Sequence, residues 1–80
     1  MKISDLNKFI GRYIASERKK LGYTQKEFAY LLYVNPTTYN GYEKGKHSFP
    51  LGVLMELSFM FNINIDNMFT SCIYYLNEGE

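Results

Sequence analysis

Apolar side chains recur at helical spacing in five separate stretches of this 80-residue chain. The first predicted helix runs from about Ser4 or Asp5 to Lys20, with Ser4 as its cap. Its apolar positions are Leu6, Ile10, Tyr13, Ile14 and Leu21. Gly22 follows, and a glycine at this place is typical of a helix that ends in a left-handed conformation.

Two short helical patterns come next, in the segment 24–45, with almost nothing between them. The first starts at Thr24 and has Glu27 at the capping-box spacing. Its inner face is formed by Phe28, Ala29 and Leu32. The second starts with Asn35 as a cap and Pro36 at the first helical position. Its inward positions are Tyr39 and Tyr42. A link of about three residues, 33–35, predicts a helix-turn-helix corner rather than a hairpin of long helices.

The last part of the chain predicts two more helices. Pro50 restarts helical structure after the loop 44–49, and the apolar positions that follow are Val53, Leu54, Leu57, Met60 and Phe61. Asn64 is the expected cap of the final stretch, whose apolar positions are Ile65, Met68, Phe69, Cys72, Ile73 and Leu76. Because Thr70, Ile73, Tyr74 and Tyr75 also suit a strand, a strand stays open as the alternative there.

The composition and motifs of the chain limit how its fold can be stabilised and which activities are expected. One cysteine, Cys72, cannot form an internal disulfide, so packing must stabilise the fold. No stretch is apolar enough to span a bilayer and no secretory signal is recognisable, so we expect a soluble cytoplasmic protein. Neither a metal-ligand cluster nor a nucleophile motif is present, and we expect no enzyme activity, cofactor, metal or small-molecule ligand. His47, the only histidine, is expected to be a solvated loop residue.

Charge is distributed unevenly along the chain although the net charge is only +1. Nine basic and four acidic residues up to His47 give that part a net charge of +5. Four acidic residues and no basic residue follow, which gives −4. This asymmetry favours a DNA-facing half and a protein-facing half, with ordinary solvated charge as the alternative.

The order and spacing of about 60 residues resemble the XRE/Cro (lambda-repressor-like) helix-turn-helix DNA-binding family. The residues that carry the resemblance are Ile10, Gly11, Arg18, Gly22, Thr24, Gln25, Phe28, Ala29, Val34, Asn35, Thr38, Tyr42, Glu43, Gly45, Pro50, Leu54, Leu57, Phe61, Ile63, Asp66 and Phe69. The resemblance implies an all-α, five-helix fold whose third helix enters the major groove. It also implies an ion pair between Arg18 and Glu43, and a Gln25 that touches the DNA backbone and braces the recognition helix.

Spacing and chemistry divide the predicted DNA contacts into two groups. Base-facing positions on the recognition helix are Pro36, Thr37, Asn40 and Gly41. Phosphate-facing positions are Thr24, Gln25, Lys26, Lys44 and Lys46. Neither Pro36 nor Gly41 has a side chain that can hydrogen-bond a base. Readout through backbone, shape and water, a close approach at Gly41, and weak or lost DNA binding therefore all stay open.

We expect a single domain, 1–80, with a core of about 6–69 and a C-terminal extension, 70–80, that is a candidate dimerisation segment. The expected function is a sequence-specific transcriptional regulator, a repressor that binds a palindromic operator as a homodimer. The candidate dimer contacts are Met68, Cys72, Ile73 and Leu76, and the alternative is that this face completes the core of one chain. The rival function is a protein–protein interaction module on the same fold, because Tyr30, Leu31 and Tyr33 are expected near the surface.

Overall fold

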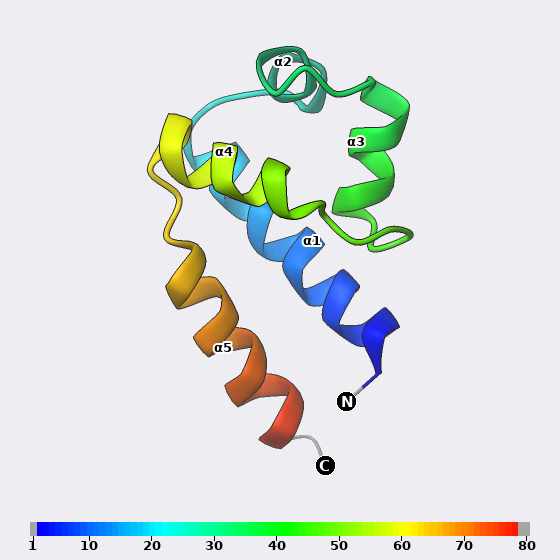
Figure 1. Ribbon diagram of the computed structural model, residues 1–80, viewed down its shortest axis with the longest axis vertical. Helices are drawn as coiled ribbons and strands as arrows, with labels where there is room; N and C mark the ends of the chain where they lie inside the picture. Colours follow the sequence, from blue (N-terminus) through cyan, green and yellow to red (C-terminus); the bar gives the residue numbers. More distant parts are fainter. Residues whose placement is uncertain (1, 79–80) are drawn as a thin grey trace.

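Residues 2–78, which the computed structural model describes, form five helices and no strand. The helices are α1 (Ile3–Lys20), α2 (Gln25–Leu31), α3 (Pro36–Glu43), α4 (Leu51–Phe61) and α5 (Ile65–Glu78). The helix α1 runs diagonally through the molecule and packs against both α3 and α5 (Figure 1). The start of α1 and the end of α5 lie at the end of the molecule away from α2. The predicted all-α fold of five helices is confirmed.

The first helix begins one residue earlier than Ser4. Lys2 occupies the cap position without a capping side chain, and its carbonyl oxygen accepts hydrogen bonds from the N–H groups of Asp5 and Leu6. Ser4 therefore lies inside the first turn, and its prediction as the cap was wrong. The C-terminal end follows the prediction, because Gly22 takes a φ of +85°.

Aromatic rings fill the space between α2, α3 and α4. The rings of Phe28 and Phe61 lie 4.3 Å apart, and Tyr23 and Tyr39 also pack against Phe28. The buried hydrophobic side chains of the described residues are Ile10, Ile14, Phe28, Ala29, Leu32, Tyr39, Phe49, Leu54, Leu57, Ile63, Met68 and Cys72. Fully buried Ala29 lies where the corner of α2 and α3 brings the two helices together, so a small side chain is needed there.

Two further helix ends are fixed by asparagine. Asn62 ends α4 in the left-handed conformation, with a φ of 57°. The Asn64 side-chain oxygen then accepts a hydrogen bond from the N–H of Asn67 at 2.8 Å, which is the predicted cap of α5. The segment that also suited a strand is helical throughout, because its alternating three- and four-residue apolar steps bury one side against α1.

The buried side of α5 contains two of the four side chains that the sequence predicts as contacts with a second chain. Met68 and Cys72 are fully buried within the single chain, and Leu76 is half-buried. Burial also raises the pKa of the Cys72 thiol. Because these two side chains already fill the space between α5 and the rest of the core, they do not offer a surface to a second chain. Only Ile73 of the four predicted contacts is exposed.

Candidate nucleic-acid interface

The start of α2 is held by a capping box, as the sequence predicts. The Thr24 hydroxyl accepts a hydrogen bond from the N–H of Glu27 at 3.1 Å, and the N–H of Thr24 donates to the Glu27 carboxylate at 2.9 Å. These bonds lower the pKa of Glu27, the larger part coming from the Thr24 backbone N–H. The turn thus fixes the position of Gln25 at the first residue of the helix.

The side chains of Arg18 and Glu43 form the implied ion pair between α1 and the end of α3. Arg18 Nε donates to one carboxylate oxygen at 2.8 Å and Nη2 to the other at 3.1 Å, so the pair is bidentate. Arg18 Nη1 also donates to the carbonyl of Tyr23 at 2.6 Å. Both charged residues are buried, and the hydrogen bond to Glu43 raises the pKa of Arg18. The pair therefore ties α1, the α1–α2 turn and α3 together.

Glu43 receives two more hydrogen bonds besides those from Arg18. Tyr39 donates its hydroxyl proton from one turn earlier in α3, and Gln25 Nε2 donates at 2.8 Å. Burial opposes the charged form of Glu43, yet the bonds from these three side chains together hold its pKa below the ordinary value. Burial, with the bond to Glu43, raises the pKa of Tyr39. The sequence places Tyr39 inward but gives no sign that its hydroxyl would meet Glu43.

Acid should weaken the fold through Glu43. Its pKa in the folded protein lies below the ordinary value of 4.5, so the folded state binds fewer protons than the unfolded state. The contribution of Glu43 to the free energy of unfolding is fully present above about pH 4.5 and is lost as the pH falls through the lowered pKa. Urea unfolding of the wild type and of Glu43→Gln at a series of acidic pH values measures it. The variant should lose less stability than the wild type over this range, and equal losses would contradict the assignment.

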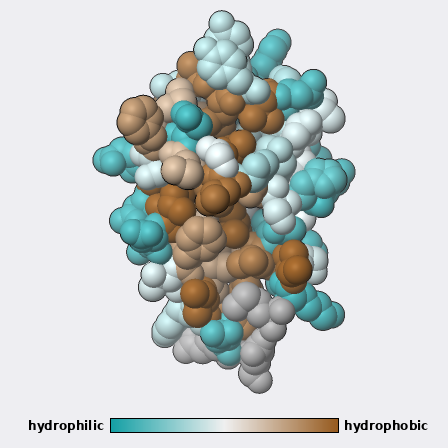
Figure 2. Space-filling model, in the orientation of Figure 1, coloured by the Kyte–Doolittle hydropathy of each residue, from teal (hydrophilic) through white to brown (hydrophobic). Residues whose placement is uncertain are grey.

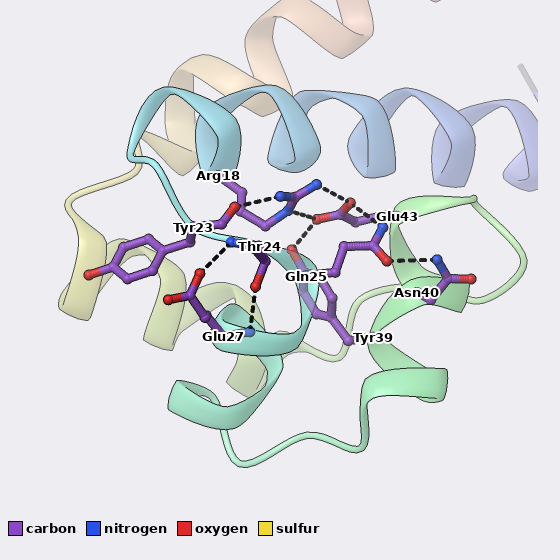
Figure 3. A network of polar contacts seen from close by, with 8 residues as sticks. All are labelled: Arg18, Tyr23, Thr24, Gln25, Glu27, Tyr39, Asn40 and Glu43. Atoms are coloured by element: carbon purple, nitrogen blue, oxygen red, sulfur yellow. Dashed lines mark hydrogen bonds and ion pairs between the residues drawn. The ribbon is translucent and has the colours of Figure 1, made fainter.

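The polar chain continues from Glu43 to the outer face of α3 (Figure 3). Gln25 donates to Glu43, and its own side-chain oxygen accepts a hydrogen bond from Asn40 Nδ2 at 2.8 Å. Gln25 therefore braces α3, the helix that the resemblance assigns to the major groove. Asn40 is half-buried rather than free in solvent, and its amide is oriented by Gln25. One N–H and the side-chain oxygen of Asn40 stay available, which is what a bidentate contact with adenine needs.

The first turn of α3 presents the remaining polar side chains. The Asn35 side chain caps the helix by accepting from the N–H of Thr37 at 2.9 Å. Pro36, Thr37 and Thr38 are all exposed beside it. The sequence prediction left out Thr38, although its place one residue after Thr37 in the first turn is a usable signal. This turn and Asn40 form the part of α3 that can meet base edges.

Gly41 does not lie on the outer surface as predicted. It is buried, because the His47 ring from the following loop covers it, and a Cβ atom at Gly41 would stand 3.1 Å from His47 Cδ2. The prediction of Gly41 as a base-facing residue was therefore wrong, and His47 packs on the helix although its own outer surface is exposed. Lys44 and Lys46 lie in this loop before His47 and are exposed, as is Lys26 on α2.

The corner between α2 and α3 contains a strained and exposed aromatic residue. Tyr33 has a φ of 57°, a conformation that costs a side chain with a Cβ about 1 kcal/mol. Its side chain is 98% exposed, and Tyr30 on the same side is 80% exposed. A mostly apolar hollow of about 530 Å³ lies next to Tyr30 and is lined by Tyr23, Lys26, Glu27, Tyr30 and Leu31. Leu31 is half-buried and reaches the surface in the lining of this hollow.

A family model described as helix-turn-helix matches residues 14–67, which is more than half of the chain. The chain belongs to the XRE/lambda-repressor-like helix-turn-helix family. The matched segment contains the capping box, the Arg18–Glu43 pair and the Gln25–Asn40 contact. Searches of curated proteins and of solved structures gave no match.

Membership of the helix-turn-helix family makes this chain a member of a family of DNA-binding regulators. Within the part of the chain that the structure describes, no three His, Cys, Asp or Glu residues come together in a way that would hold a metal ion. Over the same residues, no helix has both the length and the apolar character needed to cross a membrane.

Proposed function

We propose that this helix-turn-helix protein is a sequence-specific transcriptional regulator, a repressor that binds a two-fold symmetric operator as a homodimer. The observation that carries the proposal is the braced pair of Gln25 and Asn40. A side chain that reads a base must be held in one orientation, and here α2 supplies the partner that orients the amide of Asn40 on α3. A solvated surface asparagine would not need such a chain of hydrogen bonds back to a buried ion pair.

Base readout would be concentrated at the start of α3. Asn40 offers a donor and an acceptor, which together match adenine in the major groove. Thr37 and Thr38 offer a hydroxyl and a methyl group each, and the methyl groups suit contact with a thymine. Pro36 offers only apolar contact. Because three polar side chains span only a few base pairs, useful specificity requires two half-sites and therefore two copies of the chain.

The first turn of α3 and Asn40 form the surface proposed to read bases, which we call the reading surface. Phosphate contacts would come from both sides of it. Lys26 and Gln25 lie at the start of α2, and Lys44 and Lys46 follow the end of α3. The Thr24 hydroxyl accepts from the helix backbone and keeps its proton for an outside acceptor. A repressor of this kind acts by occupying its operator and excluding other proteins from that stretch of DNA.

The salt dependence of DNA binding tests the proposal. We expect the wild type to bind random duplex DNA with an affinity that falls steeply as salt increases, because each phosphate contact releases counterions. Lys44→Ala and Lys46→Ala should each reduce the slope of log affinity against log salt by about 0.9. Fluorescence anisotropy titrations at several salt concentrations measure this slope.

Lys2→Ala is the matched control for this titration. Lys2 is equally an exposed lysine, but it lies at the start of α1, and the start of α1 is at the end of the molecule away from α2 (Figure 1). Its removal should leave the slope within error of the wild type. If the slope changes equally in all three variants, net charge rather than these contacts governs binding. If the wild type does not bind even at low salt, the proposed function fails.

The rival function, a protein-binding module, has one specific observation in its favour. Tyr33 keeps a strained backbone and a fully exposed ring at a corner where glycine would avoid the strain. Tyr30 and the neighbouring hollow extend this apolar surface along α2. Absence of DNA binding at low salt would favour this second function, because the same helices would then present a protein-facing surface.

A further inference from the structure

Helices α4 and α5 together expose an apolar face that no part of the described chain covers. On α4 it consists of Leu51, Met55 and Phe59, which are spaced four residues apart and are 73%, 64% and 87% exposed. On α5 it continues with Phe69 and Ile73, also four apart, which are 39% and 54% exposed. Figure 2 shows hydrophobic side chains gathered in a band over these two helices. We call these five residues the α4–α5 face.

The α4–α5 face contains both a projection and a depression. A mostly apolar groove of about 170 Å³ lies between the two helices and is lined by Leu51, Leu54, Met55, Ser58, Ile65 and Phe69. Phe59 follows the groove residue Ser58 in α4 and is the most exposed residue of the α4–α5 face. Ser58 is one of the groove residues, and Gly52, which follows Leu51 in α4, has open space beside it, because a Cβ added there would meet no atom within 4 Å. A neighbouring helix can therefore approach α4 closely.

The scarcity of charged residues on α4 and α5 favours a second copy of this chain over a strongly charged partner protein. Between Leu51 and Asn77 the two helices carry only two charged residues, Glu56 and Asp66, and neither belongs to the α4–α5 face. A strongly basic or acidic partner would find little to pair with. A second copy needs no such pairing, because in a two-fold contact the same patch faces itself.

The size of the face fits a small dimer interface. If each of its five side chains hides on the order of 100 Å² of surface, each copy loses about 500 Å² and the pair about 1,000 Å². That total is near the lower limit for a specific interface, so the free dimer should be weak and should be strengthened when two half-sites on DNA hold the copies together.

We propose that the α4–α5 face is the docking surface for a second copy of this chain, in a two-fold contact in which Phe59 of each copy packs into the groove of the other. This inference gives the interface for the proposed homodimer and rests on that part of the proposed function. The centre of the proposed interface therefore lies on α4 rather than at the buried Met68 and Cys72, and Ile73 lies at its edge.

Sedimentation equilibrium of the full chain, without DNA, tests the interface with a matched pair of variants. Leu51 and Ile3 are each the first residue of a helix and are both 73% exposed, so aspartate has the same effect on either helix start. Leu51→Asp and Phe59→Asp should each weaken the dimer at least tenfold, because each puts a charge into an apolar contact. Ile3→Asp should leave the dissociation constant unchanged. Circular dichroism confirms that each variant is folded.

Two results would overturn the interface. One is a wild type that remains monomeric at the highest soluble concentration, which would leave the face to a different protein. The other is a dimer that Leu51→Asp and Phe59→Asp weaken no more than Ile3→Asp does. Titration of random duplex DNA keeps the two proposals apart. A dimer without DNA binding supports the interface and refutes the regulator, whereas a monomer that binds DNA does the reverse.

Discussion

Replacement of Arg18 by methionine is expected to lower the free energy of unfolding by about 3 kcal/mol or more. Methionine fills a similar volume but leaves the Glu43 carboxylate buried without its cationic partner. The remaining donors, Tyr39 and Gln25, are neutral and do not replace the lost charge. Urea unfolding followed by circular dichroism measures the change.

A second ion pair on the same helix provides the control for Arg18→Met. Lys20 and Glu17 approach to 3.9 Å, with the lysine side chain 71% exposed. Exposed ion pairs contribute little to stability, so Lys20→Met should change the free energy of unfolding by less than about 0.5 kcal/mol. The double variant Arg18→Met with Glu43→Gln should cost less than the sum of its single changes, because no unpaired buried charge remains. Additive costs would show that the two groups do not interact.

Replacement of Gly11 by alanine is the second change with a large expected effect, a loss of about 2 kcal/mol. A Cβ atom at Gly11 would stand 2.6 Å from the carbonyl oxygen of Tyr42 and 2.8 Å from the carbonyl carbon of Glu43. Both are backbone atoms at the end of α3, so no side-chain rotation relieves the contact. The helices α1 and α3 must move apart, which outweighs the gain of about 1 kcal/mol that alanine brings to a helix.

Gly52→Ala is the matched control, since Gly52 also lies in a helix but has open space around its missing side chain. This variant should lose no stability and can gain up to about 1 kcal/mol. Unfolding midpoints of both variants in urea, at a concentration where the protein is monomeric, give the comparison. A Gly11→Ala variant as stable as the wild type would show that α1 and α3 are not in close backbone contact.

The two large effects share a consequence for DNA binding. Arg18 and Gly11 both fix the end of α3 against α1, one through the carboxylate of Glu43 and the other through the backbone beside it. Glu43 in turn orients Gln25, and Gln25 orients Asn40. The position of the side chain proposed to read a base therefore depends on two residues of α1 that lie well behind the reading surface.

Local chemistry was sufficient to predict the helices and most of their ends. The capping box of Thr24 and Glu27, the cap at Asn35 and the stop at Gly22 each depend on residues within a few positions of one another. Such interactions form in the same way whatever the rest of the chain does. The start of α1 was misplaced because Ser4 is a good cap by type, whereas the helix simply extends to Ile3 without one.

The resemblance supplied what local chemistry did not, the pairing of Arg18 with Glu43 and the bracing role of Gln25. Arg18 and Gln25 lie 25 and 18 positions from Glu43 in the sequence, so their contacts with it depend on how α1 and α2 pack on α3. From residue type alone, Arg18 and Glu43 are two ordinary surface charges. Packing brings them together and removes water from both.

The sequence by itself determined that this chain has five helices, a helix-turn-helix corner and a basic first half. Only the tertiary structure decided which side chains are available to contact DNA or a second chain. It buried Gly41 under His47, oriented Asn40 through Gln25, and placed Met68 and Cys72 in the core while leaving Leu51, Met55 and Phe59 exposed. The physical reason is that helical spacing gives the direction of a side chain around its own helix. Whether a neighbouring element covers that direction depends on contacts between residues far apart in the chain.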